Sequence, residues 1–77
     1  MAIGFVLINV TPTLERKVFE TLSKIQEIKE LYQLFGEYDI IAKVETKDYE
    51  SLGDTVVNTI RSIQGVLNTK TLTAINF

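Results

Sequence analysis

The stretch Ala2-Ile-Gly-Phe-Val-Leu-Ile-Asn-Val10 decides the fold, because it has the composition of a strand and is apolar on both faces. β-Branched and aromatic residues favour extended structure. Successive side chains of a strand point to opposite sides, which separates two apolar sets: Ile3, Phe5 and Leu7 on one face, and Val6, Ile8 and Val10 on the other. We therefore expect a central strand with one face on the core and a second face that also needs cover.

Two segments further along carry apolar residues at helical spacing, each with start and stop signals. The first should run to about Gln26, with Pro12 breaking the preceding strand and Thr13 as its N-cap. The second should follow Asp48, a good N-cap, and end at Gly65, which suits a left-handed cap. Its apolar stripe consists of Leu52, Val56, Ile60 and Ile63. The sequence thus predicts two amphipathic helices.

Three more strands are expected at residues 28–35, 38–45 and 66–77, which gives the order β-α-β-β-α-β. A faint repeat, in which residues 24–28 resemble residues 62–66, indicates two similar βαβ halves. This order predicts an α+β, ferredoxin-like sandwich with both helices on one face of a four-stranded antiparallel sheet. The expected strand order is 4-1-3-2, with Asn68 and Lys70 typical of an edge strand. Residues 1–77 form one domain in this reading.

The composition excludes several function classes. The chain of 77 residues has no cysteine and no histidine, so disulfides, Cys/His zinc sites and thiolate or imidazole catalysis are excluded. We expect no enzyme activity, no catalytic residues and no cofactor, although an all-carboxylate site for a hard metal stays possible. With a net charge of −2 and scattered basic residues, direct nucleic-acid binding is not expected. No apolar run is long enough for a membrane span, so we expect a cytoplasmic protein without membrane contact.

The second apolar face of the first strand predicts self-association. Both helices cover the same face of the sheet, and a chain this short has no spare segment for the other face. Monomers rarely expose large apolar patches. We therefore expect a dimer whose sheets face each other. RNA binding through the sheet is a weaker reading, because the third strand is aliphatic around residues 40–42.

The turn Gly36-Glu37-Tyr38-Asp39 is the most specific local feature. A hairpin turn alone explains it equally well, since Gly36 supplies unusual backbone angles and acids are common in turns. As a binding site, Asp39 would accept hydrogen bonds from an ammonium group, and free turn amides would hold a carboxylate. Together these groups suit an amino acid. We expect Asp39→Ala to weaken ligand binding and leave the fold intact.

Two further features have a functional reading beside a structural one. Thr69 and Thr71, with Thr73, lie on one face of the last strand, where their hydroxyls could bind a ligand. Threonine is also simply a good strand residue, and this reading is favoured. Gly53 inside the second helix costs about 1 kcal/mol relative to alanine. Either the close approach of a ligand or backbone, or drift at an exposed site, explains it.

The chain resembles the effector domain of the Lrp/AsnC transcription regulators, also called the RAM domain. The resemblance rests on Gly36-Glu-Tyr-Asp39, the following Ile40-Ile-Ala-Lys-Val44, and Ile63-Gln-Gly-Val66 with Thr69-Lys-Thr-Leu72. It implies dimers that assemble into rings, commonly octamers, with amino-acid effectors bound between dimers near the turn. By this resemblance Gly36, Tyr38 and Asp39 line the pocket, with Thr69 or Thr71 as weaker candidates. The chain looks like a stand-alone domain without the family's helix-turn-helix.

The resemblance implies an amino-acid-sensing and oligomerisation module, which would modulate transcription by co-assembly with full-length Lrp/AsnC regulators. Two alternatives stay open. The chain could be an assembly or interaction protein without a ligand, whose turn is purely structural. Less favoured is a small enzyme on a ferredoxin-like scaffold, since histidine and cysteine are missing.

Overall fold

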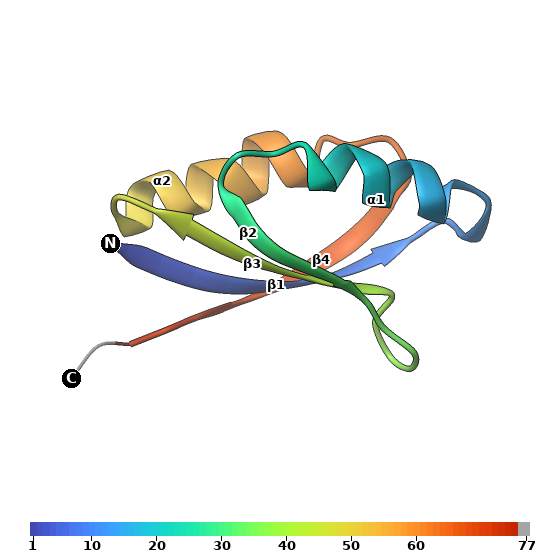
Figure 1. The fold of residues 1–77 in the computed structure, drawn as a ribbon, viewed down its shortest axis with the longest axis horizontal. Coiled ribbons are helices and arrows are strands. Elements are labelled where there is room, and N and C mark those ends of the chain that lie inside the picture. Colours follow the sequence, from blue (N-terminus) through green and yellow to red (C-terminus); the bar gives the residue numbers. More distant parts are fainter. Residues whose placement is uncertain (76–77) are drawn as a thin grey trace.

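A computed structural model describes residues 1–75 and confirms the order of elements and the α+β, ferredoxin-like class (Figure 1). All strand pairings are antiparallel, in the order β2-β3-β1-β4, with β1 and β3 central as predicted. The elements are β1 (Ala2–Val10), η1 (Pro12–Leu14), α1 (Glu15–Ser23), β2 (Ile28–Gln33), β3 (Ile40–Thr46), α2 (Tyr49–Asp54), η2 (Thr55–Ile60) and β4 (Val66–Thr73).

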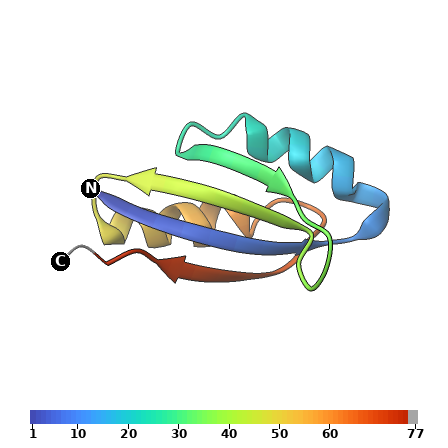
Figure 2. The ribbon, with the colours of Figure 1, turned by 60° about the horizontal axis from the view of Figure 1, so that its bottom comes forward.

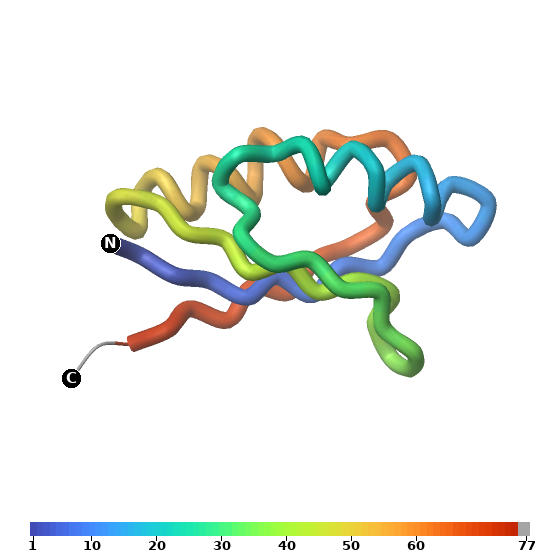
Figure 3. Tube along the Cα trace, in the orientation of Figure 1, coloured from blue at the N-terminus to red at the C-terminus, as the bar shows by residue number. Residues whose placement is uncertain are grey.

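The helices lie together on one side of the sheet, and no described segment covers the other side (Figures 1 and 3). We call the uncovered side the open face; Figure 2 shows it turned toward the viewer. The core lies between helices and sheet and is entirely apolar, with no buried polar side chain among residues 1–75. Its largest fully buried side chains are Ile8, Leu22, Ile40, Ile60, Val6, Val18 and Val44.

Strand register fixes which residues reach the open face. Val6 pairs with Ala42 on one side and Thr71 on the other, and this row faces the helices. The neighbouring row consists of Lys43, Phe5 and Leu72, and it points to the open face. Of the two apolar sets in β1, the one with Val6 is therefore the core and the one with Phe5 is uncovered.

The start of the first helix differs from the prediction. Residues Pro12–Leu14 form a short 3-10 turn, η1, and α1 begins only at Glu15. No side chain caps either segment, so the predicted role of Thr13 as N-cap is wrong. Pro12 lies at the start of η1, where its missing amide hydrogen is no disadvantage and its fixed φ suits helical backbone. Helical structure therefore begins at Pro12, earlier than predicted, and its first turn has the tighter 3-10 geometry. The helix also ends at Ser23, before the predicted Gln26.

The second helix begins as predicted but widens along its length. The Asp48 side chain accepts a hydrogen bond from the Ser51 amide at 2.7 Å, which confirms the N-cap. From Thr55 onward the turns are of the π type, as the bond from the Arg61 amide to the Val56 carbonyl at 2.9 Å shows. The helix ends at Ile60 with Arg61 as its C-cap, so the predicted end at Gly65 and the predicted role of Gly65 as the helix cap are wrong. Gly65 has a φ of 107° and lies in the turn that leads into β4.

Four strand ends differ from the predicted ones, and one of them, the end of β3 at Thr46, differs by a single residue. β2 stops at Gln33 and β3 starts at Ile40, because the Leu34 amide donates to the Asp39 carbonyl at 2.8 Å and closes a longer hairpin loop. β4 ends at Thr73, and the predicted continuation to residue 77 lies partly outside the described residues. No helix in residues 1–75 has the length and apolar character that a membrane crossing requires.

Candidate functional site

The loop of residues 35–38 projects from the sheet on the side away from the helices (Figures 1 and 2). Phe35 is completely exposed at its tip, with a relative exposure of 108%. Gly36 follows with a φ of 137°, a backbone conformation that other residues rarely adopt. An added Cβ at Gly36 would meet no atom within 4 Å, so backbone conformation and not crowding favours glycine here.

The amides of this loop are free. None of those from Phe35 to Tyr38 donates a hydrogen bond to another residue within the described part of the chain. Successive unsatisfied amides in a turn form a concave site for an anion such as a carboxylate. The role of these amides in holding a carboxylate stays a prediction.

Asp39 lies where the loop returns to the sheet, and both its amide and one of its carboxylate oxygens form hydrogen bonds with β1. Its amide donates to the Ile8 carbonyl at 3.0 Å, and its carboxylate Oδ2 accepts from the Val10 amide at 2.9 Å. Asp39 therefore bridges the loop and the end of β1. Its other carboxylate oxygen has no partner among the described residues, so a charge-assisted bond to a ligand's ammonium remains available.

Thr69 and Thr71 lie on the helix side of β4, opposite Ile8 and Val6. Together with α2 and η2 they line a hollow of about 350 Å³ that we call the threonine groove. The Tyr49 hydroxyl donates to the Ala74 carbonyl at 3.2 Å, which ties the start of α2 to the end of β4. The groove is lined by Tyr49, Leu52, Gly53, Val56, Val57, Arg61, Thr69, Thr71 and Thr73.

Within one chain, the five predicted site residues do not form a single pocket. Gly36, Tyr38 and Asp39 belong to the projecting loop, and none of them lines the threonine groove. The loop points away from the helices (Figure 1). The groove, by contrast, is lined by residues of α2, η2 and β4. Sequence reasoning also missed Val57 and Arg61. The signal that could have found them is their position one residue after the core-facing Val56 and Ile60.

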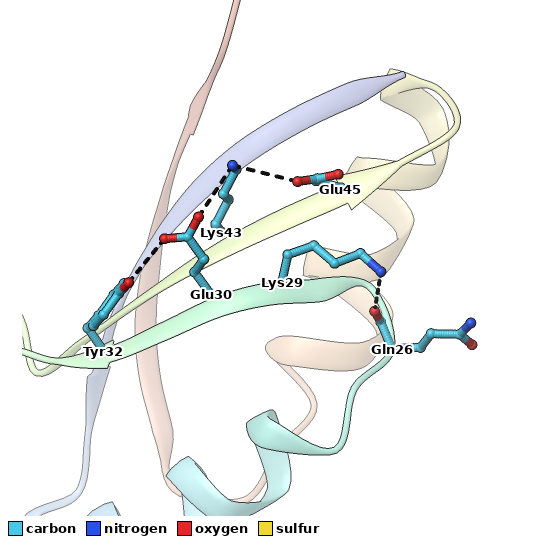
Figure 4. A network of polar contacts seen from close by, with 6 residues as sticks. All are labelled: Gln26, Lys29, Glu30, Tyr32, Lys43 and Glu45. Carbon is cyan, nitrogen blue, oxygen red and sulfur yellow. Dashed lines mark hydrogen bonds and ion pairs between the residues drawn. The ribbon is translucent and has the colours of Figure 1, made fainter.

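The open face carries a polar cluster beside its apolar residues (Figure 4). The Lys43 ammonium lies 3.4 Å from a carboxylate oxygen of Glu30 and 3.6 Å from one of Glu45. The Tyr32 hydroxyl donates to the other Glu30 oxygen at 3.1 Å, and this hydrogen bond to a carboxylate raises the pKa of Tyr32. In water such exposed pairs contribute little to stability. Beside the cluster, the Lys29 ammonium donates to the Gln26 carbonyl at 3.0 Å.

A second hollow of about 380 Å³ lies at the edge of the sheet and is less suited to a small ligand. Its lining consists mostly of long polar side chains: Gln26, Glu27, Lys29, Glu45, Thr46, Lys47, Ser51 and Thr55. The lining includes two lysines and two glutamates, so a ligand charge of either sign would meet like charges as well as opposite ones. The described residues contain no group of three or more Asp or Glu side chains placed to hold a metal ion.

The order of the elements and the antiparallel sheet with two helices on one face define a small domain of the ferredoxin-like class. The chain belongs to the Lrp/AsnC family: the family model described as "Lrp/AsnC ligand binding domain" matches residues 3–76. This confirms the family resemblance of the sequence.

Individual relatives agree with this assignment. The chain is 37% identical over 70 residues to the HTH-type transcriptional regulator FL11 of Pyrococcus abyssi, a match that covers 91% of this chain and 46% of FL11. It thus spans about half the length of the regulators that it matches. The crystal structure of TTHA0845 from Thermus thermophilus is similar with a TM-score of 0.93 and 35% identity, over 100% of this chain and 96% of that one.

A more distant structure shares the fold. It is that of the transcriptional regulator NMB0573 from Neisseria meningitidis, in complex with L-Met, with a TM-score of 0.87 and 19% identity. The similarity covers 97% of this chain and 50% of that one.

Proposed function

We propose that this chain senses an amino acid and that ligand binding controls its assembly with other copies. The observation that carries the proposal is the set of amides without hydrogen bonds in residues 35–38, which immediately precede Asp39 and its half-free carboxylate in the chain. These groups are complementary to the two charges of an amino acid. The amides would receive the α-carboxylate, and the free oxygen of Asp39 would accept from the α-ammonium.

The proposed site is completed by a second copy of the chain. The loop supplies groups for the α-carboxylate and α-ammonium but no cavity, since Phe35 at its tip is completely exposed. The threonine groove supplies a cavity, with the Thr69 and Thr71 hydroxyls at its side. Because the two lie apart within one chain, we propose that the loop of one copy meets the groove of another. The L-Met complex of NMB0573 supports an amino acid as the ligand class.

Assembly begins in this proposal with the open face. Phe5 is 37% and Leu72 51% exposed, and they are neighbours across the β1–β4 pairing. With Ile3, Leu7 and Ile41 beside them they form an apolar surface that a second sheet would remove from water. We propose that two sheets pack face to face and that these dimers join further through loop and groove, up to a ring such as an octamer.

Ligand binding between copies would stabilise the larger assembly by mass action. We propose that this link between ligand and assembly serves amino-acid-responsive transcription, through co-assembly with full-length Lrp/AsnC regulators. The regulators that the chain matches support this context, since they are described as HTH-type transcriptional regulators. The proposed role involves no catalytic step.

Light scattering on the purified chain, with and without each of the twenty amino acids, tests the proposal. We expect a mass of several multiples of 8.7 kDa that shifts with one or a few amino acids. A separate binding titration of the same amino acids shows whether the shift follows binding. A mass that stays monomeric in every condition would contradict the proposed assembly.

A ligand-free assembly module is the second candidate, favoured by the open face, which needs a partner whether or not a ligand exists. It predicts an oligomer of constant mass with no amino acid bound in the titration. That result would assign the loop of residues 35–38 a purely structural role.

A further inference from the structure

We infer that the threonine groove selects amino acids with an uncharged, apolar side chain and rejects lysine and arginine. This inference rests on the proposed function, in which the loop of another copy holds the α-carboxylate and α-ammonium of the ligand. The side chain then enters the groove. What the groove can accept follows from its shape and from the charges that line it.

The groove is small and its floor is apolar. Its volume of about 350 Å³ is at the lower end of the range of roughly 300–1,000 Å³ that small-molecule pockets have. Leu52 and Val56 form the floor and are almost fully buried, while Val57 is half exposed and adds an accessible apolar wall. An aliphatic or thioether side chain would exchange water for these contacts.

The positive charge of Arg61 in the lining of the groove disfavours binding of a basic side chain. Arg61 is the only charged residue among those lining it, and no aspartate or glutamate is present there. The nearby Asp54 on the same helix is already bonded to the Asn58 amide nitrogen at 2.8 Å. A lysine or arginine side chain would place a second cation in the groove, with no carboxylate to compensate for lost hydration.

An acidic side chain also fits less well than an apolar one. Arg61 is exposed, so water and salt screen its attraction for a carboxylate. A carboxylate beside Arg61 would gain only this screened attraction, whereas one placed on the Leu52–Val56 floor would lose water and meet hydroxyls and methyl groups.

Gly53 keeps the middle of the groove open. It lines the groove, and a Cβ added at Gly53 would meet no atom within 4 Å. A larger side chain there would therefore extend into free space without disturbing the core. Since glycine inside a helix is less stable than alanine, an open groove explains Gly53 better than local stability does.

Calorimetric titration of the full chain with leucine, methionine, glutamate, lysine and arginine tests the selectivity. We expect leucine or methionine to bind at least ten-fold more tightly than the two basic amino acids and glutamate. Tighter binding of lysine, arginine or glutamate would overturn the selectivity and leave amino-acid sensing standing. Binding of none of the twenty amino acids would overturn the proposed function and the selectivity with it.

Two pairs of variants locate the side chain of the ligand. Gly53→Leu should fold with an unchanged or higher melting temperature, and should lose affinity for the preferred amino acid by ten-fold or more. Gly53→Ala is the matched control and should lose much less. Unchanged affinity in Gly53→Leu would place the ligand outside the groove and overturn the inference.

The second pair tests charge at constant shape. Val57→Asp introduces a carboxylate into the groove wall, while Val57→Asn introduces a neutral side chain of nearly the same size. We expect Val57→Asp to bind lysine at least ten-fold more tightly than Val57→Asn does. Equal lysine affinity in both variants would show that position 57 does not face the ligand, which contradicts the inference.

Discussion

The Asp39 carboxylate accepts a hydrogen bond from the Val10 amide at 2.9 Å, so the residue that we propose binds the ligand also holds the end of the central strand. The Asp39 amide reinforces this link through its bond to the Ile8 carbonyl. Anything that moves the Asp39 side chain therefore changes both the loop and β1. A ligand at Asp39 would be coupled to the sheet in the same way.

This double role changes the expected result of Asp39→Ala. The variant leaves the part-buried Val10 amide without an acceptor, which should lower the free energy of unfolding by about 1–2 kcal/mol. Asp39→Asn keeps an acceptor oxygen for Val10 and should be nearer to the parent in urea denaturation. Both should bind the amino acid more weakly, because both lose the negative charge. Full ligand affinity in Asp39→Asn would remove the charge of Asp39 from the site.

Gly65→Ala should destabilise the fold by about 1–3 kcal/mol, because a Cβ there would lie 2.9 Å from Val18 Cγ2 and the backbone has a positive φ. Gly53→Ala is the matched comparison, since its Cβ would meet open space, and it should stabilise by about 0.5–1 kcal/mol. Urea denaturation of both variants measures the difference. Equal effects of the two substitutions would contradict the packing around Gly65.

Phe5→Asp should break the proposed face-to-face dimer. Phe5 lies outside the core, so the isolated chain should keep its fold by circular dichroism. The variant replaces an apolar ring with a charge that must lose water against the partner sheet. Lys43, the cross-strand neighbour of position 5, can pair with this carboxylate within one chain but does not restore the apolar contact with the partner. We expect light scattering to report a smaller mass than for the parent. Lys17→Glu, on the exposed side of α1, is the control and should keep the parent's mass.

Stability should depend on pH through Asp48. The Ser51 amide donates to its carboxylate and lowers the pKa of Asp48 below its ordinary value of 3.8. A lowered pKa in the folded state means that the contribution is complete above 3.8 and is lost as the pH falls through the folded pKa. Asp48→Ala should therefore melt at a lower temperature than the parent at neutral pH, and the gap should narrow in acid. A gap that widens in acid would contradict this assignment.

The sequence predicted the element order and the sheet order, because both depend on periodicity that the whole chain carries. The strand Ala2–Val10 shows this most clearly. The alternation of its side chains alone separated the core set, which contains Val6, from the uncovered set, which contains Phe5. Element ends were less predictable. The chain forms a 3-10 turn from Pro12, and the Leu34 amide donates a hydrogen bond to the Asp39 carbonyl. Both features depend on backbone hydrogen bonds, which residue types do not specify.

The candidate site was predictable only in part. Gly36, Tyr38 and Asp39 were recognisable as a turn with a carboxylate, but the bond between Asp39 and Val10 joins residues 29 positions apart. To predict the threonine groove, one would have to know which face of the second helix lies beside β4. Val57 and Arg61 occupy an ordinary solvent-facing pattern in the sequence, and only the packing of η2 beside Thr69 and Thr71 brings them into one hollow.

The second helix carries two sets of side chains that are offset by one residue. Leu52, Val56 and Ile60 are buried and hold the core, whereas Gly53, Val57 and Arg61 line the groove and are exposed. If the groove binds the ligand as we propose, substitutions in the second set change which side chains it accepts, at little cost in folding. During evolution, such a helix can exchange one specificity for another by single neutral steps, while the neighbouring positions preserve the same scaffold.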